Sequence, residues 1–449
     1  MRRFRLVLRG LALAVLGLSL AGGRASAAGP VRGRAGEAGF PPIQLYTPEG
    51  PLASSQNFAV AQDSSGVIYV GNLGGLFVYD GAWWRRLGKG DAAILSVATD
   101  TRGQVAIGSV DEFGVFVPDA SGALIYRSLA ALLPAGSAVG YVRYTHHVAG
   151  GFCFLTETQL LVWNGGALTV VASFPARPVA VAPRSFRVDD TVFVWLKDGV
   201  FRLDGTRLVD VPGGRRFAGR PVDAVVSADG GGWIAAVAGE GLRRFDASAE
   251  SEFAPRASRW AVARELTRAT RLHDGRYALG SRQGGVLLLA PDGEVERSVH
   301  SIHGLPDDYV RGMLPDRDGD LWLALNGGLA RLATSSPLSV FDVRAGLRGS
   351  VVALERHAGT LFIGSSAGLF SIAPEEAEIA SESREAPRRV MAAAAVAQRT
   401  DLAASVFSLL SVGSDLLVGT GSGLRWIDAR GAHSVNGTAD ETVYTLVRS

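Results

Sequence analysis

Five side chains suited to ligand binding stand close together in one stretch of this sequence. They are Tyr141, Arg143, Tyr144, His146 and His147, and the equivalent stretches elsewhere in the chain differ from it. Phenol, guanidinium and imidazole groups hydrogen-bond polar ligands, and binding sites combine such groups with aromatic surface. We therefore expect this stretch to face a small-molecule or oligosaccharide ligand. The alternative is that its histidines have a structural role or only line a pocket.

A second candidate is the densest aromatic pair of the chain, Trp83 and Trp84, which follows Asp80 and Gly81. Exposed tryptophans offer flat surface to a ligand, so we include both among the candidate ligand-binding residues. The competing interpretation is that at least one of the two packs between neighbouring structural units.

Metal binding and catalysis are not favoured. The carboxylates of residues 316–320 lack the ligand spacing and the closing glutamate of a calcium loop. His146 and His147 are adjacent, so on a strand they point to opposite faces, and no partner ligand accompanies them. Asp111 and Glu112 are expected to be architectural. The sequence has no nucleophile elbow, phosphate loop or dinucleotide fingerprint, so we expect no catalytic residue, no metal and no cofactor.

Composition narrows the function classes further. Forty-five Lys and Arg residues against 43 Asp and Glu give a formal charge of +2. No basic stripe of the kind that nucleic-acid binding requires is present. Cys153 is the single cysteine, so an intrachain disulfide is excluded. Because it lies in an apolar run, we expect it to be a buried small hydrophobe.

A repeated phrase indicates which elements position these residues. An Asp, a Gly, a burst of β-branched or aromatic residues, a Gly-rich turn and a second apolar burst recur, most clearly from Asp63 and from Asp318. Successive copies lie roughly 37 to 55 residues apart, which suits a four-stranded propeller blade of about 40 to 45 residues. The apolar runs are short and bounded by Gly, Asp, Asn and Ser, as in strands joined by hairpins. The predicted fold class is therefore all-β.

The number of copies predicts the domain organisation. Seven begin near Phe58, Ile94, Val139, Phe186, Val222, Thr267 and Tyr309, and two more begin at Val351 and Val406. We expect a seven-bladed β-propeller at residues 41–334, followed at residues 335–449 by the first blades of a second, incomplete β-propeller. Residues 374–400 are rich in Ala, Glu and Arg and are expected to be an insertion, either a surface loop or a short helix.

The recurring residue types have physical reasons. An aspartate that starts a turn accepts hydrogen bonds from the backbone amides that follow, and glycine adopts positive φ. These residues should close the hairpin between the first two strands of each blade. The glycines Gly71, Gly364 and Gly419 should end the second strand where a side chain would obstruct packing.

The two ends of the sequence differ from the repeats. A basic start, an apolar run from Leu6 to Ala21 and the small residues Ala25 and Ala27 predict a signal peptide at residues 1–27, and hence export to the periplasm. The alternative is an uncleaved anchor helix. At the other end, Glu441 to Ser449 is expected to start a tenth unit. A ring that stops there would expose apolar faces and strand edges, so we expect a fragment of a longer protein.

Several phrases together resemble the two-component regulator propeller family. They are Ser55 to Asp63, Gly71 to Gly81, Ile107 to Gly114 and Gly304 to Val310. The most specific part runs from Gly304 to Leu323, and the resemblance covers about residues 41–449. It implies the extracytoplasmic sensor region of a hybrid two-component histidine kinase or related receptor, in which two seven-bladed propellers typically precede an Ig-like domain, a membrane helix and an output module.

Two function classes follow. The first is the ligand-sensing ectodomain of a transmembrane receptor, without catalysis in this chain, in which ligand binding biases a dimeric output. Homodimerisation, membrane attachment through a downstream helix and output chemistry are implied only for the full-length protein, because this sequence lacks those parts. The alternative is a free periplasmic propeller that acts as a binding scaffold or as a carbohydrate-active hydrolase or lyase. Fold alone does not separate the two.

Overall fold

The computed structural model describes residues 39–88, 91–134, 137–178, 181–372, 396–428, 430–439 and 441–447. The expected signal peptide at residues 1–27 and most of the expected insertion at residues 374–400 lie outside the described residues. Apart from one α-helix and a few single-turn 3-10 helices, the regular structure of these ranges consists of strands. The predicted all-β fold class is confirmed.

The strands form four-stranded antiparallel sheets, nine in the described residues, and in most of them the strands follow chain order. The first three sheets are made of β2 (Asn57–Gln62), β3 (Ile68–Asn72), β4 (Gly75–Tyr79) and β5 (Trp84–Leu87), of β6 (Ser96–Thr99), β7 (Val105–Gly108), β8 (Phe113–Pro118) and β9 (Leu124–Ser128), and of β10 (Tyr144–Val148), β11 (Gly151–Leu155), β12 (Gln159–Trp163) and β13 (Leu168–Ser173).

The next three sheets follow the same plan. They are made of β14 (Arg184–Val188), β15 (Thr191–Leu196), β16 (Gly199–Asp204) and β17 (Arg207–Asp210), of β18 (Val222–Ser227), β19 (Trp233–Val237), β20 (Gly241–Phe245) and β21 (Glu250–Glu252), and of β22 (Leu266–Arg271), β23 (Tyr277–Ser281), β24 (Val286–Leu289) and β25 (Val295–Val299). The α-helix, α1 (Pro255–Ala263), packs against β20.

The seventh sheet joins segments from far apart in the sequence. It consists of β26 (Val310–Pro315), β27 (Leu321–Leu325), β28 (Gly328–Leu332) and, as its outer strand, β1 (Ile43–Tyr46). β1 pairs with β28 in a register that places Leu45 opposite Ala330. The first strand of the domain thereby completes the last sheet, a closure that the repeat pattern did not reveal because β1 carries no copy of the phrase.

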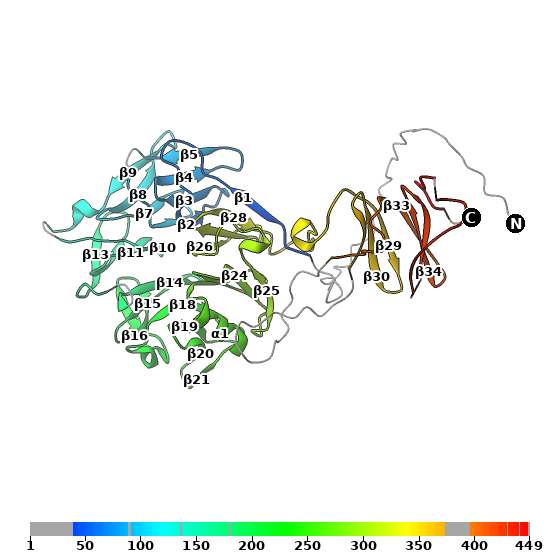
Figure 1. The fold of residues 1–449 in the computed structure, drawn as a ribbon. Coiled ribbons are helices and arrows are strands. Elements are labelled where there is room, and N and C mark those ends of the chain that lie inside the picture. The colour runs from blue at the N-terminus through cyan, green and yellow to red at the C-terminus, as the bar shows by residue number, and fades with distance from the viewer. Residues whose placement is uncertain are drawn as a thin grey trace, which may run out of the picture.

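The first seven sheets form a closed ring, seen on the left of Figure 1. The first strand of each sheet contacts that of the next, in the order β2, β6, β10, β14, β18, β22 and β26, and β26 contacts β2 again. Seven sheets arranged in this ring are consistent with the predicted seven-bladed β-propeller. The first strands lie innermost, because each is followed outward by the other three strands of its sheet.

Apolar side chains between neighbouring sheets hold the ring together. Where the ring closes, Val60, Val70 and Phe77 of the first sheet pack against Trp322 and Leu329 of the seventh. Similar clusters lie between other neighbouring sheets. Each sheet of the ring is therefore packed against a neighbour on both faces. This packing accounts for the high share of hydrophobic residues in the chain, 47%.

The expected roles of the aspartates and glycines are confirmed at the turns. Asp63 Oδ1 accepts hydrogen bonds from the amides of Ser65 at 2.9 Å and Val67 at 3.0 Å. A Cβ added to Gly71 would lie 2.6 Å from the carbonyl oxygen of Ile94, at the approach to the next sheet. The second strand of one sheet thus ends beside the start of the next first strand, where backbone packing leaves no room for a side chain.

Two further sheets follow the ring, drawn from yellow to red in Figure 1. One contains β29 (Val351–His357), β30 (Thr360–Ser365), β31 (Gly368–Ile372) and β32 (Ala397–Gln398), and the other contains β33 (Val406–Val412), β34 (Asp415–Thr420), β35 (Gly423–Asp428) and β36 (Gly431–Ser434). β29 contacts β33, as neighbouring first strands do in the ring.

Two details of this second unit differ from expectation. Part of the expected insertion, β32, pairs with Phe370 and Ser371 and is the fourth strand of its sheet rather than a loop or helix. Residues 441–447 form no strand, so the expected first strand of a tenth unit is wrong for the described residues. Val443 does donate a backbone hydrogen bond to Thr420 at 3.0 Å, the same bond that Ile94 makes to Asn72 in the ring. Residues 441–447 thus approach Thr420 as a next first strand would, but they do not form a strand.

Candidate functional site

A central channel of about 730 Å³ runs through the ring and is lined by all seven innermost strands. Each contributes short or polar residues, such as Ala59, Ser96, Thr145, Ser185 and Ala224. The volume is within the range of small-molecule sites. The lining strands belong to sheets that pack against a neighbouring sheet on both faces in a closed ring. The walls of this channel are therefore rigid.

The ligand-binding stretch predicted from sequence lies on this channel. β10 is the innermost strand of the third sheet, and Arg143, Tyr144, His146 and His147 all line the channel. Tyr141 lies just before the strand, 42% exposed, and the guanidinium carbon of Arg143 is 4.3 Å from the centre of its ring. The fold therefore brings four of the five residues to one wall, whereas Tyr141 does not line the channel.

His146 is engaged in a contact between neighbouring sheets. Its Nε2 atom hydrogen-bonds Ser185 Oγ on β14 at 2.9 Å. Burial, with the positive charge of Arg187, lowers the pKa of His146 to about 4. A neutral imidazole bound to a buried hydroxyl is a structural bridge, and it parallels the 2.7 Å bond between Ser96 and Thr145 that joins β6 to β10.

Tyr144 and His147 are better placed to meet a ligand. Both are partly exposed on the channel wall, and burial, followed by Arg187, lowers the pKa of His147 below its ordinary value. The imidazole is thus neutral at pH 7 and can both donate and accept a hydrogen bond. A polar ligand in the channel would meet a phenol and an imidazole on the same strand.

The aromatic pair predicted as a second ligand-binding site lies elsewhere. Trp84 begins β5, the outermost strand of the first sheet, and its ring stacks on Tyr79 with centroids 4.9 Å apart. Trp83 is 76% exposed on the adjoining turn. Neither lines the channel. Trp84 therefore fits the competing interpretation, in which at least one tryptophan of the pair has a packing role.

Charged residues that the sequence did not single out gather where the innermost strands begin. Arg184 forms an ion pair with Asp223 at 3.1 Å, bridging β14 and β18. The guanidinium of Arg268 on β22 lies 5.8 Å from the ring centre of Tyr144. That of Arg311 on β26 lies 4.4 Å from the ring centre of Tyr309. The sequence did contain a signal that could have identified these arginines. In several repeats an arginine stands at the start of the first strand.

The carboxylate cluster of residues 316–320 is bridged by an arginine of the same sheet. Arg331 reaches Asp316 at 2.8 Å, Asp318 at 3.0 Å and Asp320 at 3.3 Å. Among the described residues, no group of three or more His, Cys, Asp or Glu side chains is arranged to hold a metal ion. The cluster belongs to the hairpin, where the amides of residues 318 and 320 bond Asp316 Oδ1.

Asp111, Glu112 and Cys153 have local structural roles. Asp111 has a positive φ of 55° and exchanges two hydrogen bonds with Gly140. Glu112 accepts hydrogen bonds from Tyr126 at 3.0 Å and Ser128 at 2.9 Å. Burial raises the pKa of the Cys153 thiol to about 12, which leaves it protonated and unreactive.

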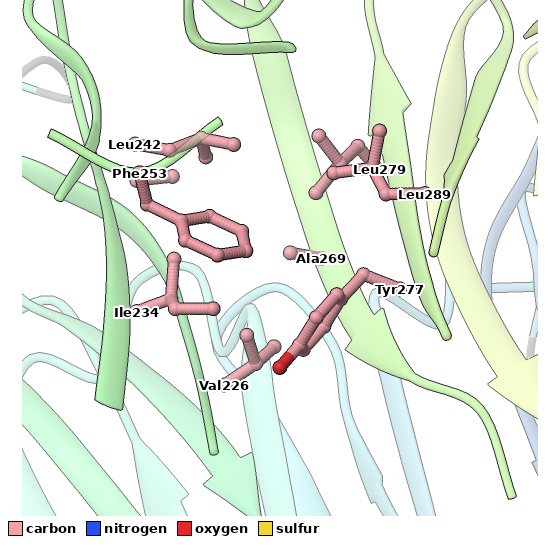
Figure 2. A pocket seen from close by; sticks show the side chains of 9 residues that line it. Val226, Ile234, Leu242, Phe253, Ala269, Tyr277, Leu279 and Leu289 are labelled. Carbon is pink, nitrogen blue, oxygen red and sulfur yellow. The ribbon is translucent and has the colours of Figure 1, made fainter. Parts of the chain in front are cut away.

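A second cavity, shown in Figure 2, lies between the fifth and sixth sheets and does not suit a ligand. Its volume is about 10 Å³, which is room for one water molecule at most. Figure 2 shows the rings of Phe253 and Tyr277 bordering it among aliphatic side chains. The central channel is therefore the candidate site.

Comparisons with known proteins agree with the fold. Residues 304–327 match the family model described as two component regulator propeller. This match confirms the resemblance at its most specific part. No curated protein matches the sequence significantly.

Solved structures similar to this chain include two described as extracellular domains of hybrid two component systems from B. thetaiotaomicron. One has a TM-score of 0.59 and 15% identity, and the other a TM-score of 0.49 and 14% identity. In each comparison 90% of this chain is covered and 55% of the other, so the chain spans little more than half their length. A virginiamycin B lyase from Staphylococcus aureus has a TM-score of 0.46 and 10% identity, over 65% of this chain and 98% of the lyase. At such identities the likeness concerns the fold.

Within the part of the chain that the structure describes, no helix is long and apolar enough to cross a bilayer.

Proposed function

We propose that this chain is the ligand-sensing periplasmic region of a transmembrane signal-transduction receptor of the two-component type. The observation that carries the proposal is a rigid central channel in which one strand, β10, departs from the repeat and presents Tyr144 and His147. The two-component regulator propeller repeat at residues 304–327 supports the receptor assignment. A small molecule or an oligosaccharide is the proposed ligand.

In this proposal the chain binds its ligand without transforming it. The imidazole of His146 is bonded to Ser185, and no carboxylate is among its hydrogen-bond partners in the described residues. Ligand binding would shift an equilibrium between two arrangements of the sensor, and the shift cannot exceed the difference in affinity for the two. We further propose export to the periplasm, dimerisation of the full-length receptor and attachment to the membrane through a helix outside this chain.

A fractionation experiment tests the receptor assignment. An antibody raised against residues 57–332 is used to detect the native product in membrane and soluble fractions. A membrane-bound band much larger than the 47.0 kDa of this chain is the expected result. A soluble periplasmic species of about that mass would overturn the assignment and favour a free binding propeller.

A binding experiment tests the site. The chain is screened by thermal shift against a panel of oligosaccharides and small polar metabolites, with and without substitution of both Tyr144 and His147 by alanine. We expect a stabilising compound whose effect is lost in the double variant. The matched control is Trp83→Ala, because Trp83 is exposed and lies outside the channel. Unchanged stabilisation of a folded double variant would reject this wall as the site, and turnover of the compound would reject the non-catalytic assignment.

A further inference from the structure

The innermost strands all begin at the same end of the channel. In the first sheet, a Cβ on Gly71 would meet Ile94, which precedes β6, and in the sixth, a Cβ on Gly280 would meet Val310, the first residue of β26. The second strand of each such sheet thus ends beside the start of the next first strand. Because second strands run antiparallel to first strands, the starts of β6 and β26 lie at the end where β2 and β22 also begin.

Arginines collect at this end, which we call the entry rim and define by Arg143, Arg268, Arg282 and Arg311. Arg143 immediately precedes β10, whereas Arg268 and Arg311 lie within the first three residues of β22 and β26. Arg143 and Arg268 line the channel. Arg282 follows β23 directly, and its guanidinium lies 5.0 Å from the same Tyr309 ring that Arg311 covers. Three sheets, the third, the sixth and the seventh, therefore bring positive charge to one opening.

Aromatic rings lie against three of the rim arginines and help to hold them in place. Some of the guanidinium donors are engaged in hydrogen bonds, since Arg311 donates to Asn326 Oδ1 at 2.9 and 3.2 Å and Arg268 donates to the carbonyl oxygen of Thr267 at 2.8 Å. Arg143 lies over Tyr141, Arg268 over Tyr144, and Arg311 over Tyr309. A ring that covers the face of a guanidinium leaves its N–H groups free to donate in the plane. Such stacking lowers the entropic cost of binding, because the guanidinium is already oriented before a ligand arrives.

The positive charge at the rim is only partly compensated. In the described residues, Arg143 and Arg268 form no ion pair with a carboxylate, whereas Arg282 lies 3.5 Å from Glu265. Burial lowers the pKa of Arg311, and the charges of Arg282, Arg143 and Arg268 lower it further. The nearby Asp223 pairs with Arg184, and burial raises the pKa of its carboxyl. Like charges gathered at one opening repel each other, and an anion relieves this repulsion most directly.

We propose that the entry rim binds an oxyanion group, a carboxylate or a phosphate, of the ligand that enters the channel. The planar fork of a guanidinium matches both groups with two parallel hydrogen bonds. The neutral donors and acceptors of Tyr144 and His147 then lie deeper along the same wall, where they would meet the uncharged part of the ligand. The inference rests on the proposed ligand-binding role of the channel and adds the charge of the ligand to it.

The test uses citrate as a carboxylate probe and inorganic pyrophosphate as a phosphate probe, measured by isothermal titration calorimetry at low salt. We expect at least one to bind. Substitution of Arg143 and Arg268 together by glutamine should raise its Kd at least tenfold and flatten the dependence of Kd on salt concentration. The probe that binds more tightly identifies the oxyanion class. Far-ultraviolet circular dichroism checks that the variant is folded.

The matched control is Arg317→Gln, because Arg317 lines the same channel but follows β26 and so lies at the opposite end. We expect its Kd to stay within twofold of the wild type. Equal weakening by both variants, or no binding of either probe at millimolar concentration, would overturn the inference. Binding of an uncharged sugar that depends on Tyr144 and His147 but not on the rim arginines would also overturn it, yet would leave the proposed function standing. If the native protein is soluble and still binds an anion through the rim arginines, the inference about the entry rim stands and the receptor assignment is rejected.

Discussion

The Nε atom of Arg331 donates a hydrogen bond to Oδ2 of Asp316 at 2.8 Å, on a carboxylate whose side chain is only 1% exposed. The indole of Trp322 donates to the same oxygen at 3.1 Å. Removing one partner of a buried ion pair leaves an uncompensated charge, at a cost of about 3 to 5 kcal/mol. Since Arg331 is partly exposed, we expect Arg331→Met to lower the free energy of unfolding by about 2 to 3 kcal/mol, as measured in urea.

The control for this prediction is Arg317→Met, because Arg317 is exposed and its 3.9 Å approach to Asp318 is a weak surface pair. We expect a change within about 0.5 kcal/mol. Similar losses of stability in the two variants would contradict the prediction. They would mean that the burial of Asp316 does not determine how much Arg331 stabilises the fold.

The same geometry predicts the response to metal removal. Because the Arg331 guanidinium already lies within 3.3 Å of Asp316, Asp318 and Asp320, we expect EDTA to leave the Tm of the purified chain unchanged. Added calcium should have no effect either. A fall of several degrees with EDTA that calcium restores would show that the carboxylates hold a metal in preference to the arginine.

Close packing between sheets makes a prediction for glycine. In Gly71→Ala the new Cβ would lie 2.6 Å from the backbone oxygen of Ile94, so the first two sheets would have to separate. Overpacking of this kind typically costs about 1 to 3 kcal/mol, and we expect a loss in that range in urea unfolding. Gly166→Ala is the control, since its nearest atom is 4.0 Å away and its φ is not positive. A Gly71 variant as stable as the control would show that the sheets have slack at this point.

The repeat could be predicted from sequence because its signals are local. The Asp63 turn and the Gly71 contact arise from backbone chemistry that recurs in every blade, so strand starts such as β18 at Val222 and β29 at Val351 coincide with the predicted positions. The closure by β1 could not be predicted in this way. Its pairing with β28 joins residues almost 300 positions apart and is set by ring geometry rather than by a local pattern.

The candidate site shows the same division. The unusual composition of β10 marked Tyr144 and His147, because polar groups depart from the apolar pattern of a blade. Trp83 and Trp84 were equally conspicuous, but their position on an outermost strand removes them from the channel. Of the rim arginines, only Arg143 was marked, as part of the stretch that includes β10. Arg268, Arg282 and Arg311 escaped notice because they lie in other repeats, and only the ring brings them to the same opening as Arg143.

Acid should destabilise the protein through two partly buried histidines. The pKa of His146 is lowered from 6.5 to about 4, mainly by burial, and that of His303 likewise to about 4. Between these pH values the unfolded chain binds protons that the folded chain does not, so the free energy of unfolding falls as pH decreases from 6.5 to 4. Above pH 6.5 both states are neutral at these positions and the contribution is constant.

The variant His146→Gln isolates one of these groups, because it removes the titration and keeps a side chain able to bond Ser185. We expect the stability difference between wild type and variant to shift in favour of the variant by at most about 1.4 kcal/mol per pH unit below pH 6.5, as measured by urea unfolding at pH 7, 6, 5 and 4. His273→Gln is the control, since His273 lines the channel but is exposed. A His146 variant whose difference from wild type is constant with pH would mean that the folded protein accepts the proton, and that the bond to Ser185 does not require a neutral imidazole.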